Sequence, residues 1–279
     1  MIDSNIMLKL LDVDKSYSDN RVLCKLNLEL PTAHCIGIIG KNGTGKSTIL
    51  KIICGFITKF EGLCYKNFKT FSALIENPHF IDGLTGRDNI KYILNKKDAD
   101  NAILLVSDFG IGDYLDRSVR RYSMGMKQKL ALAITFARDS ELYLLDEPFN
   151  SIDYETVTKI INIINSKRVA GKSIITVTHN MSRIQDYCNK IYQLKNGVLC
   201  ANEHTVTNSL KQKSFLIKFA NLNDISFAKS VIGEFSCKES YQENSIIVKA
   251  IEDDISSIIK RLADYSLIGI TEIKDDNNI

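Results

Sequence analysis

Residues 40–48 read Gly-Lys-Asn-Gly-Thr-Gly-Lys-Ser-Thr, and this stretch decides the fold. An apolar, β-prone run, 35–39, precedes it, and the apolar residues of the following segment, 48–53, recur at helical spacing. A strand, a glycine-rich loop and a helix in this order are the context of a P-loop. The sequence therefore predicts an α/β fold of the P-loop NTPase class.

The loop has the chemistry of a nucleotide triphosphate site. Glycines let backbone N–H groups approach phosphate oxygens, and the following helix adds its positive N-terminal end. Lys46 would neutralise the β- and γ-phosphates, and the Ser47 hydroxyl would bind Mg²⁺. A glycine-rich turn without a ligand is the alternative, which the flanking strand and helix disfavour. The expected cofactor-binding residues of the loop are Gly40, Asn42, Gly43, Gly45, Lys46, Ser47 and Thr48.

The composition is that of an ordinary globular protein. Of the 279 residues, 44% are hydrophobic and 25% charged, which excludes disordered and fibrous classes. A net charge of +3 lacks the strong basic excess of a nucleic-acid binder. Seven cysteines without a CxxC pair indicate reduced, cytosolic thiols. No secretory signal and no run of 18 apolar residues is found, so we expect any membrane role to require a partner.

Three apolar runs end in polar residues that would meet at one edge of a parallel sheet. The run 70–75 delivers Glu76, and 142–145 leads into Asp146 and Glu147. The third run, 173–177, ends at His179 after one threonine. Asp146 could complete a Mg²⁺ shell, Glu147 could polarise a water molecule, and His179 could bind a phosphate oxygen or that water. An exposed acidic turn is the alternative for the carboxylate pair.

Two further candidates carry a structural alternative: it has equal weight for Tyr17 and is the favoured interpretation for Ser123 when that stretch is taken alone. Tyr17, in a polar turn between the expected strands 8–13 and 22–30, could stack on a nucleotide base or be a packed loop residue. Ser123 and Gly125 precede an apolar-periodic helix expected from residue 129. They could bind an anion at a helix start, or Ser123 could simply cap that helix.

With these motifs in one order, residues from about 6 to 205 resemble the ATP-binding subunit of an ABC transporter. The resemblance implies that Tyr17 stacks on adenine, that Glu147 is the catalytic glutamate and that His179 is the switch histidine. It places Ser123 and Gly125 in the signature that closes over the γ-phosphate of ATP held by a second subunit. Residues 150–153 match the D-loop of the dimer interface.

The same resemblance implies the cofactors and partners. ATP and Mg²⁺ are expected, with Lys46, Glu147 and His179 catalytic and with Ser47, Glu76 and Asp146 holding the metal. The partners would be a second nucleotide-binding subunit, in a homo- or heterodimer, and an integral membrane permease; no nucleic acid is expected. The subunit would lie on the cytoplasmic, inner face of the cell membrane as a peripheral protein.

Two positions depart from the family pattern. Glu76 stands where the Q-loop glutamine is usual, and Met126 stands at the final glutamine of the signature. Glu76 remains an oxygen ligand but adds a charge. The segment 74–80 and the sequence of 123–128 are similar to the branch that exports antimicrobial peptides such as bacitracin and lantibiotics or confers immunity to them.

The domain organisation follows from the extent of this pattern. We expect a nucleotide-binding domain over 1–210, with a helical insert at about 80–138, and a small α+β domain over 211–279. The latter is predicted as βαββαβ, a ferredoxin-like order with helices at 224–232 and 252–264. It could brace the dimer, touch the membrane partner, or only stabilise the chain.

Two rival functions remain open at this point. The first is a soluble ABC ATPase that acts on ribosomes or DNA; the single cassette and the absence of sustained heptads argue against it. The second is an ATP-gated scaffold without hydrolysis, which the pairing of Asp146 with Glu147 disfavours because a gate has little need for a base.

Overall fold

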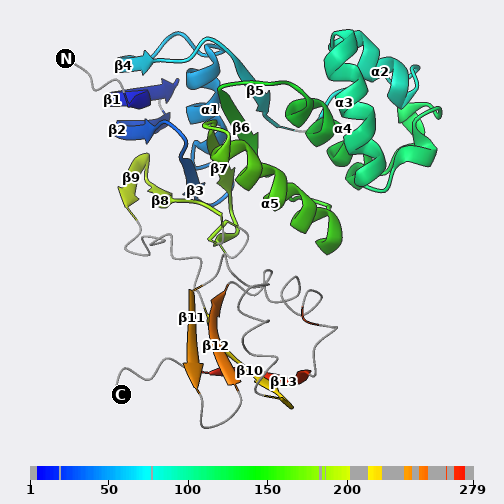
Figure 1. The fold of residues 1–279 in the computed structure, drawn as a ribbon. Helices are drawn as coiled ribbons and strands as arrows, with labels where there is room; N and C mark the ends of the chain where they lie inside the picture. The colour runs from blue at the N-terminus through cyan, green and yellow to red at the C-terminus, as the bar shows by residue number, and fades with distance from the viewer. Residues whose placement is uncertain are drawn as a thin grey trace. The chain divides into compact units, whose positions relative to one another are not determined.

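The computed structural model describes residues 5–18, 20–76, 78–181, 184–185, 187–201, 213–221, 236–240, 245–250, 262 and 267–273. The chain forms two compact units, Met1–Val206 and Thr207–Ile279 (Figure 1). Each unit has a sheet system of its own, and the two are described in turn.

A six-stranded sheet forms the centre of the first unit, in the order β5-β6-β7-β3-β8-β9. All neighbouring strands are parallel except β8 and β9, which pair antiparallel. Every residue of β3, β6 and β7 is buried, which explains their unbroken apolar runs. The strands are β3 (Cys35–Ile39), β5 (Phe71–Leu74), β6 (Leu142–Asp146), β7 (Ser173–Thr178), β8 (Lys190–Lys195) and β9 (Val198–Ala201).

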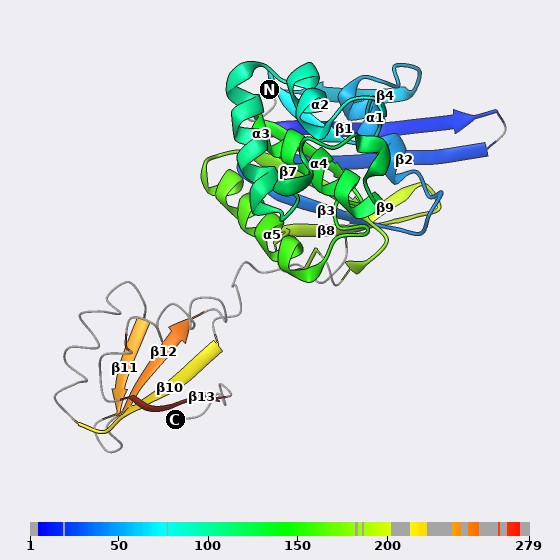
Figure 2. The same cartoon turned by 90° about the vertical axis from the view of Figure 1, so that its right-hand side faces the viewer.

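A second, antiparallel sheet has the order β2-β1-β4. Its strands are β1 (Ile6–Tyr17), β2 (Asn20–Pro31) and β4 (Glu61–Lys66), and Figure 2 shows β1 and β2 side by side over their length. Pairing continues to Tyr17 opposite Asn20. The prediction of a polar turn at Tyr17 is therefore wrong: this residue ends β1, because cross-strand pairing extends both strands beyond their apolar centres.

The described residues of this unit also form helices α1 to α5, of which α2, α3 and α4 gather into a helical group (Figure 1). Ser123 caps α4, so this helix begins at Met124 and not at the expected residue 129. Thr85 caps α2, since its Oγ1 accepts the N–H of Asp88 at 3.0 Å. The helices are α1 (Lys46–Cys54), α2 (Gly86–Ile93), α3 (Lys96–Asp108), α4 (Met124–Ala137) and α5 (Tyr154–Val169), with short 3-10 turns η1 (Gly112–Tyr114) and η2 (Val119–Arg121).

Two apolar cores lie on opposite faces of the central sheet because successive strand residues alternate in direction. Tyr143 and Leu145 pack in the core that α3, α4 and α5 share. Leu144 and Ile175 pack in the other core, with α1 and the antiparallel sheet. The sheet thus holds α1 on one face and the helical group with α5 on the other. No helix in the described ranges is long and apolar enough to cross a membrane.

The second unit contains a four-stranded antiparallel sheet of order β11-β12-β10-β13. Alternate residues of β10, Phe215, Ile217 and Phe219, are buried. The predicted helix at 224–232 lies outside the described residues, as does the one at 252–264 apart from buried Leu262. The strands are β10 (Lys213–Phe219), β11 (Ser236–Ser240), β12 (Ser245–Ala250) and β13 (Leu267–Ile273).

Ile175 tests how strongly the central sheet stabilises the first unit. Its side chain is fully buried in β7 between β3 and β6, so Ile175→Ala should lower the free energy of unfolding by about 2–5 kcal/mol through lost burial and a residual cavity. Val169→Ala at the 86% exposed end of α5 is the control and should change it by less than about 0.5 kcal/mol. Urea unfolding followed by circular dichroism measures both, and equal losses would contradict the described core.

Candidate functional site

A cleft of about 370 Å³ opens where α1 begins and β6 ends. It gathers ten of the residues predicted for the site from four separate stretches of chain. Val22 and Lys51 line it as well and were missed from the sequence. The cleft is lined by Tyr17, Val22, Asn42, Gly43, Gly45, Lys46, Ser47, Thr48, Lys51, Glu76, Asp146 and Glu147.

The loop before α1 fits the sequence expectation of a phosphate cradle. Gly45 is the N-cap of α1 and has φ of 105°, a conformation that side chains rarely adopt. A Cβ there would also lie 2.7 Å from Cγ1 of Val22. The N–H of Gly40 donates to the carbonyl of Thr178 at 3.2 Å, which ties the start of the loop to β7. The N-terminal end of α1 therefore faces the cleft with its free N–H groups.

Lys46 lies folded back on this loop and is 6% exposed. Its Nζ donates to the carbonyl oxygens of Gly40 at 2.8 Å and Lys41 at 3.1 Å, and lies 3.8 Å from Oε1 of Glu147. A phosphate oxygen is a stronger acceptor than a peptide carbonyl because it is charged. The ammonium group is thus already at the site and can exchange a carbonyl for a phosphate oxygen by a small movement.

Asp146 ends β6 with its side chain buried beside the loop. Burial raises the pKa of this carboxyl above its usual value, and hydrogen bonds from the Ser47 hydroxyl and from the N–H of Glu76 oppose that rise. Those two donors hold the charged form of Asp146 next to the Ser47 oxygen.

This donor set fits Mg²⁺ of the kind that accompanies a nucleotide. Such a magnesium ion takes one or two carboxylates and completes its shell with phosphates and water. Ser47 and Asp146 supply two adjacent oxygens at the cleft. No group of three or more His, Cys, Asp or Glu within the described part of the chain is placed to hold a metal by itself.

Glu147 and His179, from two neighbouring strand ends, are brought together. Nδ1 of His179 lies 2.8 Å from Oε1 of Glu147, and the Thr178 hydroxyl donates to Oε2 at 2.8 Å. Glu147 has φ of 47°, unusual for a residue with a side chain, and its N–H donates to the Val177 carbonyl at 2.9 Å. The carboxylate is therefore oriented from both sides, which suits a general base; Thr178 was not foreseen from the sequence.

Glu76 lies in the loop after β5 with φ of 63°. Its carboxylate forms an ion pair with the ammonium group of Lys51 on α1. The sequence carried a signal for the position of Lys51 but not for its partner: Lys51 follows Ser47 by four residues and so shares its face of the helix. Whether Glu76 binds metal stays a prediction, and in the structure its side-chain partner is a lysine.

Tyr17 is 47% exposed at the end of β1 and lines the cleft. Nζ of Lys15 lies 4.8 Å from the centre of its ring, within the range of a cation–π contact. An exposed ring at the cleft mouth can offer its face to a flat base.

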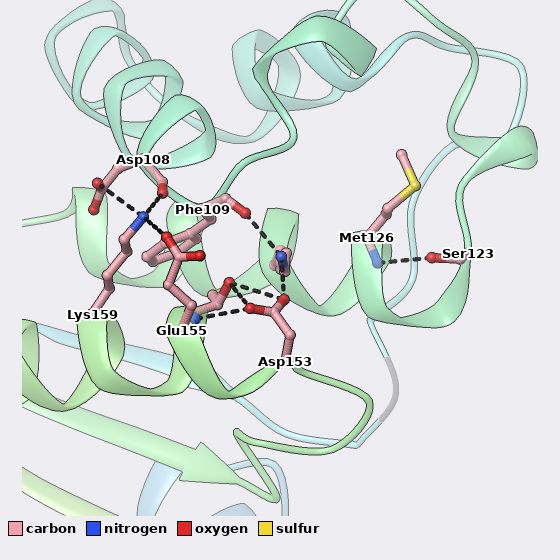
Figure 3. Close-up of polar contacts among 9 residues, drawn as sticks. Asp108, Phe109, Ser123, Met126, Asp153, Glu155 and Lys159 are labelled. Carbon is pink, nitrogen blue, oxygen red and sulfur yellow. Dashed lines mark hydrogen bonds and ion pairs between the residues drawn. The ribbon is translucent and has the colours of Figure 1, made fainter.

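The signature residues lie elsewhere. Ser123 caps α4 by accepting the N–H of Met126 at 3.2 Å (Figure 3), as the alternative interpretation expected. Gly125 packs on the D-loop so closely that a Cβ would lie 2.4 Å from the Ser151 carbonyl oxygen. Neither residue is among those that line the cleft.

Two side chains in the second turn of α4 fasten this helix to the segment 147–153. Nε2 of Gln128 donates to the carbonyls of Glu147 at 3.3 Å and Pro148 at 3.2 Å. The Lys129 ammonium lies 2.5 Å from Oδ2 of Asp153 and lowers the pKa of that carboxyl. Both residues share one helix face with Gly125. The same short stretch of α4 therefore holds the signature residue Gly125 and the backbone of Glu147, the candidate base.

The same cluster joins α3 to α5 (Figure 3). Lys129 Nζ also donates to the Phe109 carbonyl at 2.9 Å, and Lys159 Nζ donates to the Asp108 carbonyl at 2.8 Å. The end of α3 is thereby tied to the D-loop and to the first turns of α5.

Comparisons with known proteins agree with this geometry. The ABC transporter family matches residues 23–150. The lantibiotic transport ATP-binding protein SrtF of Streptococcus pyogenes is 30% identical over 219 residues, which cover 74% of this chain and 95% of SrtF. The ATP-binding protein BexA of Haemophilus influenzae is 33% identical over 200 residues, covering 69% of this chain and 92% of BexA.

Solved structures show the same fold. A dimeric ATP-binding cassette in a post-hydrolysis state with ADP and phosphate is similar at a TM-score of 0.63, with 22% identity over 70% of this chain and 98% of the cassette. This likeness shows the fold, and the sequence relatives establish the family. The chain belongs to the ABC transporter family as an ATP-binding subunit, and its enzymatic class is ATPase.

Proposed function

We propose that this ATPase uses Mg-ATP to drive a membrane transporter that exports an antimicrobial peptide or gives immunity to one. The observation that carries the enzymatic part is the orientation of Glu147 by Thr178 and His179, within 3.8 Å of Lys46. A base, a phosphate-binding cation and a helix N-terminus around one cleft are the parts that phosphoryl transfer to water requires.

The proposed roles follow from the contacts. Lys46 leaves its loop carbonyls for the β- and γ-phosphates, and Tyr17 stacks on adenine while Gly40, Asn42, Gly43, Gly45 and Thr48 shape the cradle. Ser47, Asp146 and Glu76 would hold Mg²⁺, which when bound neutralises phosphate charge. Glu147 takes the proton of the attacking water, and His179 orients that water or the γ-phosphate.

A second nucleotide-binding subunit completes the proposed site. Ser123 and Gly125 lie outside the cleft of their own chain, where they serve no nucleotide. In a dimer, Ser123 and Gly125 could instead contact the ATP bound by the partner subunit. The similar cassette of known structure is dimeric, which supports this arrangement. Because α4 fastens the signature to the segment of Glu147, closure on the partner's ATP would reach the chain's own catalytic base.

The proposed cargo and location rest on likeness. SrtF is named for lantibiotic transport, and the segment 74–80 with the sequence of 123–128 is similar to the same branch. The partner would be an integral membrane permease, with this subunit peripheral on its cytoplasmic side. We further propose domains over 1–210 and 211–279, the second ferredoxin-like; the four-stranded antiparallel sheet supports it.

Glu147→Gln tests the catalytic base. The change keeps the shape of the side chain but removes its ability to take a proton, so hydrolysis should fall by roughly 10²–10⁴-fold while ATP binding remains. Phosphate release and the binding of a fluorescent ATP analogue measure the two effects. Glu155→Gln on the exposed surface of α5 is the matched control and should leave both unchanged. Normal turnover of Glu147→Gln would remove Glu147 from this role.

Co-purification tests the partners. A tagged Glu147→Gln chain is extracted from its native membranes in Mg-ATP. Its closed complexes should persist because they open only after ATP hydrolysis, which this variant cannot carry out. Mass spectrometry should then identify a second nucleotide-binding chain and a protein with several membrane spans. Capture of ribosomes, DNA or a soluble complex in their place would leave the ATPase activity intact and contradict the transport role.

A further inference from the structure

Lys51 and Glu76 form an ion pair at the proposed metal site. Glu76 is a proposed metal ligand, but Lys51 has not yet been given a role. Both residues line the cleft, and their side chains are 30% and 57% exposed. Exposed ion pairs contribute little net stability, so a pair of this kind is easily exchanged for another partner. The pair matters because it lies beside the proposed metal site, where Glu76 can exchange Lys51 for a metal ion.

The backbone keeps Glu76 at the metal site whichever way its side chain points. The N–H of Glu76 lies close enough to the Asp146 carboxylate to lower its pKa, as the Ser47 hydroxyl does, and all three residues line the cleft. The Glu76 carboxylate can therefore turn between two cations, one being Lys51 and the other a divalent ion beside Asp146. The φ of 63° at Glu76 describes its backbone, and it does not prevent the side chain from changing rotamer.

Lys51 adds a second ammonium group to a cleft that is rich in carboxylates. The cleft contains three carboxylates, Glu76, Asp146 and Glu147, and Lys46 lies beside the last of them. Without a second cation, Glu76 would add an uncompensated negative charge next to Asp146 and to the incoming phosphates. Lys51 supplies that cation from one helical turn beyond Ser47.

We propose that Lys51 is a positioning residue that competes with Mg²⁺ for the carboxylate of Glu76, and so sets the magnesium concentration at which nucleotide binds. Without Mg-ATP, Lys51 holds the carboxylate away from Ser47 and Asp146. When Mg-ATP binds, the carboxylate would turn to the metal and its ion pair with Lys51 would open. This inference rests on the proposed nucleotide site, but not on the dimer, the cargo or the membrane partner.

A double-mutant cycle tests the competition. The full-length wild type, Lys51→Met, Glu76→Gln and the double variant are each mixed with a fluorescent, non-hydrolysable ATP analogue and titrated with Mg²⁺ from an EDTA-buffered start. Lys51→Met should lower the half-saturating Mg²⁺ concentration by roughly twofold to fivefold when Glu76 is present, the size expected for one exposed ion pair. In the Glu76→Gln background the same change should have no such effect.

Controls separate competition from simple loss of charge. Lys66→Met removes a lysine near the C-terminal end of α1 that does not line the cleft, and it should leave the titration unchanged. If Lys51→Met shifted the half-saturating Mg²⁺ concentration equally in both backgrounds, Lys51 would act through its general field, and the inference would be overturned. An unchanged or higher half-saturating concentration in Lys51→Met would overturn it too. Failure of every variant to bind nucleotide at any Mg²⁺ concentration would overturn the proposed function as well.

Discussion

The parallel pairing of β6, β7 and β3 sets the positions of the phosphate-binding loop and of the carboxylates that follow β6. Ile39 pairs with Thr178, and Asp146 pairs with Val177, so the three strands end at one edge of the sheet. Two hydrogen bonds extend this pairing into the loops, from Gly40 N–H to the Thr178 carbonyl and from Glu147 N–H to the Val177 carbonyl. Loss of this register would separate the phosphate cradle from the base, because both depend on β7.

The sequence predicted the parts of the site that depend on local order. Strand, loop and helix around Lys46 follow one another in the chain, and buried strands that end in Asp146 and His179 leave few alternatives for a parallel sheet. It could not predict contacts that depend on side-chain reach, such as Lys51 with Glu76. Tyr17 was placed in a turn because pairing between β1 and β2, and not apolar alternation, determines where β1 ends.

One turn of α4 connects two functions that are separate in the sequence. Gly125 packs on the Ser151 carbonyl, Gln128 holds the carbonyls after β6, and Lys129 holds Asp153. In the proposed dimer, the signature contacts the partner's nucleotide while the same turn supports the base for the chain's own nucleotide. Each ATP would then influence hydrolysis of the other through packed and hydrogen-bonded contacts.

Calorimetric titration of the wild type and Lys46→Met with Mg-ATP tests the central claim most directly. The account predicts binding of about one ATP per chain, with affinity reduced roughly tenfold to hundredfold in Lys46→Met because charge-assisted hydrogen bonds to phosphate are lost. Equal affinities of the two proteins, or no binding by the wild type, would contradict the claim that this loop and its lysine form the nucleotide site.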